Sequence, residues 1–95
     1  MRKRIVNKAL LKEYTTKKCS VLNCYADNVC AHHIKTKGSG GDDSESNLMA
    51  LCQVHHIQVH TIGLNKFTQN YPEIISLLKQ KGWSKLQNRW KRLLN

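Results

Sequence analysis

CAHHI at residues 30–34 and LCQVHHIQVH at residues 51–60 hold all five histidines of this chain. Two of the four cysteines lie in the same stretches, and the other two, Cys19 and Cys24, precede them. Deprotonated cysteine and neutral histidine at such short spacings are the usual protein ligands of zinc and similar ions. The pattern therefore predicts metal binding.

The chain of 95 residues is long enough for one domain, residues 1–95, with a small hydrophobic core. A structural metal commonly supplements such a core, because ligand binding then adds to the free energy of folding. The sequence has no run of about 18 apolar residues, and residues 1–14 lack the apolar stretch of a secretory signal. We therefore expect a cytoplasmic protein with no membrane partner, whose reduced thiols bind metal instead of forming disulfides.

The net charge of +10 is concentrated at the two ends of the chain. Residues 1–18 hold seven basic residues and one acid, and residues 79–95 hold six basic residues and no acid. Between them, residues 19–78 hold three lysines and five acids, a net charge of −2. Two cationic ends around a histidine-rich middle favour a polyanionic partner such as nucleic acid. The alternative is that these charges belong to solvated helix faces.

The predicted elements form a small α+β domain in which helices flank a two-stranded core. A basic helix is expected from about Lys3 to Glu13, within an N-terminal segment of residues 1–18. Residues 35–46, with three glycines, form a loop between two short strands. The central segment, residues 19–67, continues into a helix that Gly63 stops. The expected strands span residues 29–34 and 47–51, and the helix after them spans residues 53–62. Two further helices are expected in the segment 68–95. One lies between Pro72 and Gly82, and the other runs from Ser84, its N-cap, to about Leu93.

The helix after the second strand carries two pairs of candidate ligands that point in different directions. Successive residues of a helix are turned by about 100°, so His55 and His56 diverge. Cys52 and His55 share one face, and His56 and His60 share another. The spacing therefore predicts two separate metal sites on one helix.

The first predicted site is a closed, structural zinc site with tetrahedral coordination. Its expected ligands are Cys19, Cys24, Cys52 and His55. The alternative is a set of buried apolar thiols without a metal. Cys30 is the remaining thiol; it could replace one of these ligands, but we expect it to pack in the core.

The second predicted site consists of His32, His56 and His60. Three ligands leave coordination positions open for water and phosphate, as a catalytic metal requires. His33 then lies beside this metal on the other side of its strand, free to act as a base. The alternative is that these histidines are surface or core residues whose nitrogens bond to backbone groups.

The order of these blocks resembles that of the HNH endonucleases, also called ββα-metal or His-Me finger nucleases. The similarity covers residues 19 to about 67 and consists of His32-His33-Ile34, a glycine-containing loop, Asn47-Leu48, Cys52, and His55-His56-x3-His60. Within that family the chain is similar to the small single-domain members common in phage genomes. It departs from the two Cys-x2-Cys pairs of many relatives, because its first pair is Cys-x4-Cys and its last zinc ligand is a histidine.

The resemblance implies a ββα-metal (HNH) core, in which a hairpin packed on a helix holds one divalent ion for cleavage of DNA. It implies His32, His56 and His60 as ligands of this catalytic ion, which could be magnesium, manganese, nickel or zinc. His33 would be the general base that activates water. Asn47 would pin the loop and orient His33 through a backbone contact.

DNA is the expected partner, held mainly through its phosphates. Other phage DNA-processing proteins are further candidates, and we expect a monomer or a weak dimer. The loop acids Asp42, Asp43 and Glu45 are expected to be held by local hydrogen bonds, with accessory metal ligation as the alternative. The predicted nucleic-acid contacts are Arg2, Lys3, Arg4, Lys35, Lys37, Lys85, Arg89 and Arg92.

Two other functions are compatible with the sequence. The chain could be a zinc-stabilised nucleic-acid-binding module without catalysis, which would need the zinc site and the basic ends but not His33 or Asn47. It could also be an accessory subunit whose activity requires another phage protein. The presence of both His33 and Asn47 favours the endonuclease.

Overall fold

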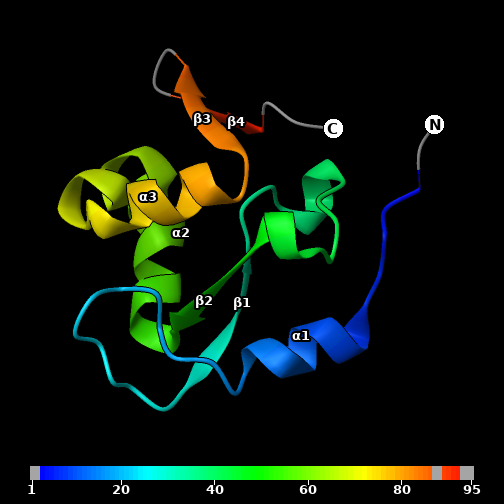
Figure 1. Ribbon diagram of the computed structural model, residues 1–95, viewed down its shortest axis with the longest axis horizontal. Coiled ribbons are helices and arrows are strands. Elements are labelled where there is room, and N and C mark those ends of the chain that lie inside the picture. Colours follow the sequence, from blue (N-terminus) through cyan, green and yellow to red (C-terminus); the bar gives the residue numbers. More distant parts are fainter. Residues whose placement is uncertain (1–2, 87–88, 93–95) are drawn as a thin grey trace.

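The computed structural model describes residues 3–86 and 89–92, which form an α+β fold with three α-helices and two small antiparallel sheets (Figure 1). The predicted fold class is thus confirmed at this level. Among the described residues, no helix combines the length and the apolar character needed to cross a membrane. The elements are α1 (Lys8–Tyr14), β1 (Val29–His33), β2 (Leu48–Cys52), α2 (Gln53–Asn70), α3 (Glu73–Gln80), β3 (Trp83–Leu86) and β4 (Arg89–Arg92), with two short 3-10 turns, η1 (Lys37–Ser39) and η2 (Glu45–Asn47), between β1 and β2.

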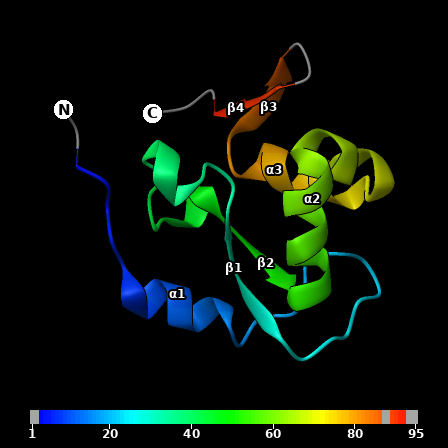
Figure 2. The ribbon, with the colours of Figure 1, turned by 180° about the vertical axis from the view of Figure 1, so that it is seen from behind.

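The strands β1 and β2 form an antiparallel hairpin at the centre of the molecule. Their register pairs Val29 with Cys52 and His33 with Leu48. All five residues of β2 are buried, because α1 and α2 lie on either side of the hairpin in both views (Figure 1 and Figure 2). The predicted strands agree with the observed ones to within one residue.

The helix α2 follows β2 without a loop and is interrupted at Gly63. This residue has a φ of 84° and a ψ of 158°, a backbone conformation that glycine adopts readily and other residues rarely adopt. Gly63 therefore interrupts the helix where its end was predicted, but the chain then resumes a helix as far as Asn70, which was not predicted. Helix α3 then begins directly after Pro72, close to the predicted start.

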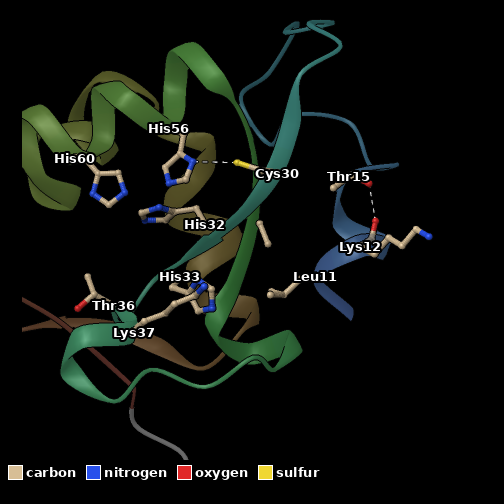
Figure 3. A pocket seen from close by; sticks show the side chains of 11 residues that line it. Leu11, Lys12, Thr15, Cys30, His32, His33, Thr36, Lys37, His56 and His60 are labelled. Atoms are coloured by element: carbon tan, nitrogen blue, oxygen red, sulfur yellow. Dashed lines mark hydrogen bonds between the residues drawn. The ribbon is translucent and has the colours of Figure 1, made fainter. Parts of the chain in front are cut away.

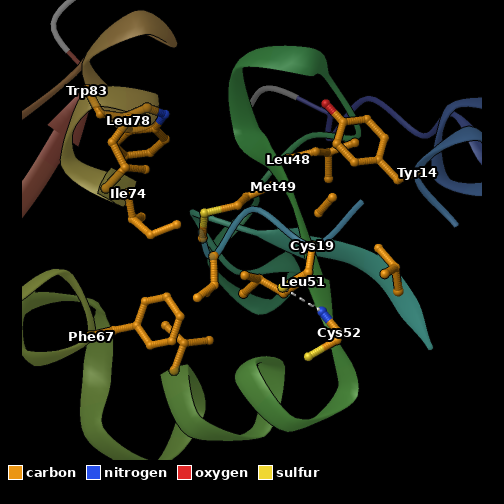
Figure 4. Packing of buried hydrophobic residues seen from close by; sticks show 14 residues of the cluster. Tyr14, Cys19, Leu48, Met49, Leu51, Cys52, Phe67, Ile74, Leu78 and Trp83 are labelled. Atoms are coloured by element: carbon orange, nitrogen blue, oxygen red, sulfur yellow. Dashed lines mark hydrogen bonds between the residues drawn. The ribbon is translucent and has the colours of Figure 1, made fainter. Parts of the chain in front are cut away.

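The hydrophobic core lies between the hairpin, the second half of α2, and α3 (Figure 4). Burial of a large apolar side chain stabilises the fold by about 1.5–3 kcal/mol, so these few residues carry much of the stability. The first half of α2, which holds the candidate ligands, lies at the edge of this core. The fully buried side chains are Leu48, Met49, Leu51, Cys52, Phe67, Thr68, Ile74 and Leu78.

The predicted helix over residues 84–93 is wrong. Residues 87, 88 and 93 lie outside the described residues, and the others form a second antiparallel hairpin, β3–β4, in which Lys85 pairs with Trp90. Trp83 is buried, and its indole N–H donates to the carbonyl of Ser46 at 2.7 Å. A short helix has little stability of its own in water, whereas aromatic residues pack well on a pleated surface. Burial of Trp83 on the first sheet's loop therefore outweighs the helix propensity of the segment.

The N-terminal helix is shorter than predicted. It begins at Lys8 instead of Lys3, because the side chain of Asn7 caps it by accepting a hydrogen bond from a backbone N–H of the first turn at 3.0 Å. Residues 3–7 form an arm without regular secondary structure, which we call the N-terminal arm. It makes hydrogen bonds with residues 41–43 of the loop between β1 and β2.

Candidate metal centres

Cys19, Cys24, Cys52 and His55 bring their ligand atoms within 4.8 Å of one another, and we call them the cysteine-rich cluster. The Nδ1 atom of His55 lies 3.2 Å from Sγ of Cys52 and 3.5 Å from Sγ of Cys19. The Sγ atoms of Cys24 and Cys52 are 3.8 Å apart. Zinc bonds of about 2.3 Å to sulfur and about 2.0 Å to nitrogen place tetrahedral ligand atoms about 3.5–3.8 Å apart. The cysteine-rich cluster is therefore geometrically able to hold a metal such as zinc.

Three parts of the chain supply the cysteine-rich cluster: the turn after α1, the end of β2, and the first turn of α2. The turn is held to β2 by a hydrogen bond from the N–H of Ser20 to the carbonyl of Ala50 at 2.8 Å. The N–H of Cys52 donates to Sγ of Cys19 at 3.3 Å, a contact that favours the thiolate. A metal at this position would join the N-terminal part of the chain to the hairpin and the helix.

The thiols of the cysteine-rich cluster differ in how readily they ionise. Burial raises the pKa of Cys19 to about 11, although the backbone donors Cys52 and Val21 act in the opposite direction. A hydrogen bond from the backbone of Ala26 lowers the pKa of Cys24 below its usual range. Without a metal, Cys19 is therefore a neutral thiol near neutral pH, and metal binding must release its proton.

His32, His56 and His60 form a second group, the three-histidine cluster, with their ligand atoms within 4.8 Å of one another. Their ring centroids are 4.8–5.2 Å apart, and the three rings gather between β1 and α2 (Figure 3). His32 is only 5% exposed, and its Nδ1 has no hydrogen-bond partner among the described residues. Because an unsatisfied buried nitrogen is costly, a ligand at this atom would stabilise the arrangement. The unsatisfied atom and the donor set both fit a metal ion.

The surroundings of the three-histidine cluster favour the neutral form of two of its imidazoles, those of His32 and His56. Burial and the neighbouring histidines lower the pKa of His32 to about 3. The same causes place the pKa of His56 below its usual range. Since neutral imidazole is the form that binds metals, protons do not compete for His32 near neutral pH. His60 is exposed, so the cluster remains open to solvent on one side.

The three-histidine cluster lies in a cleft of about 510 Å³ (Figure 3). His33 lines the same cleft, together with Lys37 from the loop and Lys12 from α1. The predicted nucleic-acid contacts did not include Lys12, which reaches the cleft because α1 packs beside β1. The ligands of the cysteine-rich cluster do not line this cleft, so the two clusters share α2 but face different surroundings.

The prediction that Cys30 packs in the core is wrong. Its side chain is only partly buried, and its Sγ lies 3.0 Å from Nδ1 of His56 (Figure 3). Residues two apart in a strand project from the same face, so Cys30 follows His32 toward α2. Burial raises the pKa of Cys30 and favours its thiol form. The spacing of two residues from His32 was the sequence signal that could have placed it here.

Asn47 holds the loop between β1 and β2 in place. Its Oδ1 accepts a hydrogen bond from the N–H of Lys35 at 2.7 Å, and its Nδ2 donates to the carbonyls of Lys35 at 3.0 Å and Asp42 at 2.9 Å. The N–H of Ile34 donates to the carbonyl of Asn47 at 2.8 Å. Three of these four contacts fall on Ile34 and Lys35, the two residues that follow His33. Asn47 therefore fixes the backbone next to His33, and its side-chain hydrogen bonds all go to backbone atoms.

The loop acids accept hydrogen bonds, but the prediction that these bonds are local is wrong, because the donors come from other segments of the chain. Asp43 contacts both Arg4 and His33 through Oδ1. Asp42 accepts from the N-terminal arm, and Glu45 accepts from the last residue of α1. Among the described residues, neither metal cluster contains an acid, so accessory metal ligation finds no support.

The predicted nucleic-acid contacts lie in different surroundings. The exposed ones are Lys3, Lys35, Lys37 and Lys85. Three predicted contacts cannot be placed: Arg2 and the side chains of Arg89 and Arg92 lie outside the described part of the chain. The guanidinium of Arg4 donates to the carbonyl of Gly41 at 2.6 Å and to Asp43. Two of the five N–H donors of this guanidinium are therefore engaged within the protein.

The two clusters offer different donor atoms, and each takes at least one ligand from α2. One is enclosed among partly or fully buried ligands, and the other opens into a cleft lined by a further histidine and by lysines. No family model, curated protein or solved structure matches this chain.

Proposed function

We propose that this chain is a metal-dependent endonuclease that hydrolyses phosphodiester bonds of DNA. The observation that carries the proposal is the convergence of His32, His56 and His60 in a cleft that His33 and Lys37 also line. Three imidazoles would leave a divalent ion with open coordination positions, and the fourth histidine would supply a base. Hydrolysis of a phosphodiester needs such an ion and such a base, together with positive charge near the phosphate.

The arrangement of the hairpin and α2 supports an HNH-type, ββα-metal core. The strand β1 carries His32 and His33, and the loop ends at Asn47. The helix α2 follows directly and carries His56 and His60. The four histidines implied by the resemblance to the HNH family thus line the same cleft, and Asn47 bonds to the backbone next to His33.

The residues of the cleft can divide the chemistry among them. When bound by the three-histidine cluster, a divalent ion supplies a Lewis acid that stabilises the departing oxygen. His33 accepts a proton from the attacking water, because imidazole can do so near neutral pH. Lys37 binds a phosphate oxygen next to the scissile bond. Asn47 holds the backbone that follows His33 and so limits the movement of the base.

The two clusters present different donor atoms to a metal. A site of three imidazoles favours nickel or zinc over magnesium and manganese, which prefer oxygen ligands. The cysteine-rich cluster has the thiolate-rich donor set of a structural zinc site. We propose that this second metal stabilises the fold and takes no part in hydrolysis.

DNA fits the charge of the chain. The net charge of +10 and the exposed lysines favour contacts with phosphates, which do not distinguish base sequences. We therefore expect weak sequence preference and strong salt dependence.

Cleavage of supercoiled plasmid tests the proposal. Magnesium, manganese, nickel and zinc are each added to wild type, to His33→Ala and to Lys35→Ala, the last as a control outside the cleft lining. We expect His33→Ala to cut about 10²–10⁴-fold more slowly while binding DNA as wild type does, because only the base is lost. An undiminished rate for His33→Ala would show that the assigned base is wrong. DNA binding without cleavage in any metal would favour the zinc-stabilised binding module instead.

A further inference from the structure

Asp43 joins the N-terminal arm to His33. Its side chain is 1% exposed, and its Oδ1 lies 2.7 Å from Nε2 of His33. The same oxygen accepts a hydrogen bond from Nη2 of Arg4. The other oxygen, Oδ2, accepts from the N–H of Asn7 at 2.8 Å. This carboxylate is therefore buried among donors from the arm and from β1.

The donors around Asp43 keep it ionised. Burial alone would raise the pKa of this carboxyl, but the hydrogen bonds from His33 and Asn7 and the charge of Arg4 hold the pKa below its usual range. A buried carboxylate is stable only with such partners. Because an ionised carboxylate can only accept hydrogen bonds, the hydrogen between Asp43 and His33 must belong to Nε2.

The position of this hydrogen decides the state of the other ring nitrogen. A neutral imidazole carries one hydrogen on its two nitrogens, so a His33 protonated at Nε2 has a lone pair at Nδ1. A histidine without such a partner samples both tautomers, and neither nitrogen is then reserved for accepting a proton. The contact with Asp43 removes this ambiguity.

We propose that Asp43 is a positioning residue that holds His33 as its Nε2–H tautomer and leaves Nδ1 to accept the proton of the attacking water. As the O–H bond of water breaks and the Nδ1–H bond forms, the water oxygen bonds to phosphorus. The bond between phosphorus and the leaving oxygen breaks, and that oxygen takes a proton from solvent. The carboxylate then faces an imidazolium, whose charge it stabilises. The catalytic half of this inference rests on the proposed function, whereas the tautomer of His33 does not.

The N-terminal arm is part of the same arrangement. Arg4 donates to the same carboxylate oxygen of Asp43 as His33, and Asn7 donates to the other oxygen. The N–H of Asp43 in turn donates to the carbonyl of Ile5 at 2.9 Å. The role of Arg4 is therefore to hold Asp43, which explains why its guanidinium is turned toward the loop.

Nitrogen-15 NMR of the imidazole rings tests the inference without any cleavage assay. We use the full chain with one equivalent of zinc and assign the His33 signals by their loss in His33→Ala. The expected result is that Nε2 of wild-type His33 carries the hydrogen and Nδ1 does not. A hydrogen on Nδ1, or equal populations of the two tautomers, would overturn the proposal. This measurement needs no variant of Asp43, so it decides the matter even if Asp43→Asn fails to fold.

The variant Asp43→Asn extends the test, with Glu45→Gln as its matched control. Glu45 is an acid of the same loop, but its Oε2 accepts from the hydroxyl of Tyr14 at 2.9 Å. Asp43→Asn should shift His33 toward a mixture of tautomers, and Glu45→Gln should leave the wild-type tautomer in place. An unchanged tautomer in a folded Asp43→Asn would contradict the inference.

Kinetics then separate positioning from stability. Asp43→Asn should lower kcat by about 10–100-fold with KM little changed, a range typical of partners that orient a functional histidine. In the His33→Ala background the same substitution should cause no further loss, because the group that it positions is gone. Independent, multiplying losses would show a purely structural role. If wild type does not cleave DNA at all, the proposed function fails while the NMR result stands.

Discussion

The Sγ atom of Cys30 lies 3.0 Å from Nδ1 of His56, across the contact between β1 and α2. This contact leaves Nε2 of His56 as the nitrogen available to a metal. Histidines that bind metals usually engage their second nitrogen in a hydrogen bond, which fixes the tautomer and the ring orientation. Cys30 occupies the position of such a partner.

The contact predicts that Cys30 tunes metal binding at the three-histidine cluster. Cys30→Ala should weaken the affinity for nickel by about 10–100-fold, because His56 loses the group that orients it. Cys30→Ser retains a polar atom at this position and should weaken the affinity for nickel less than Cys30→Ala does. Calorimetric titration with nickel measures both, and equal affinities for wild type and Cys30→Ala would count against this role.

The cysteine-rich cluster predicts a metal-dependent stability. Cys24→Ser should release zinc and lower the free energy of unfolding by more than about 3 kcal/mol, since loss of a structural metal belongs to the most destabilising changes. The matched control is Cys30→Ser, which changes a thiol outside this cluster. Thermal unfolding and zinc content are measured together. Identical melting temperatures for the two variants would contradict a structural zinc.

Zinc uptake should also depend on pH. The pKa of Cys19 in the metal-free protein is raised to about 11, so this thiol is protonated near neutral pH and must lose its proton to bind zinc. Affinity should therefore rise with pH, and binding should release protons into the buffer. Calorimetry in two buffers of different ionisation enthalpy counts these protons. A reaction heat that is the same in both buffers would show that no proton is released.

Asp43 predicts a pH-dependent contribution to stability. Its pKa lies below its usual value in the folded protein, so its stabilising effect is present above the unfolded pKa of about 3.9 and is lost as the pH falls through the folded pKa. The difference in unfolding free energy between wild type and Asp43→Asn should therefore be largest near neutral pH and shrink in acid. Denaturant unfolding of the two metal-free proteins at several pH values, from neutral to acid, measures this difference in free energy. A difference that grows on acidification would reverse the predicted sign.

Lys37 and Lys35 provide a matched pair for DNA binding. Both are exposed residues of one loop, but only Lys37 is among those that line the cleft. Lys37→Ala should weaken binding and reduce the salt dependence of the binding constant by about 0.9 log units per log unit of salt, the effect of one lost phosphate contact. Lys35→Ala should change the slope less. Binding titrations at several salt concentrations compare them, and equal slopes for both variants and wild type would remove Lys37 from the interface.

The division of the ligands into two clusters followed from local spacing. The turn of about 100° per residue separates His55 from His56 on any helix, whatever packs around it. Gly63 interrupts α2 and Pro72 precedes α3 for equally local reasons, since each restricts or frees the backbone at its own position. The strands could be placed to within one residue because a glycine-containing loop separates them.

Contacts between distant segments required the tertiary structure. Asp43 contacts both His33 and the N-terminal arm, which lies against the loop, and Cys30 meets His56 because β1 packs against α2. The β3–β4 hairpin replaces a predicted helix because Trp83 is buried against the loop. Such outcomes depend on free energies of burial summed over residues far apart in the chain, and local propensities differ by too little to decide them.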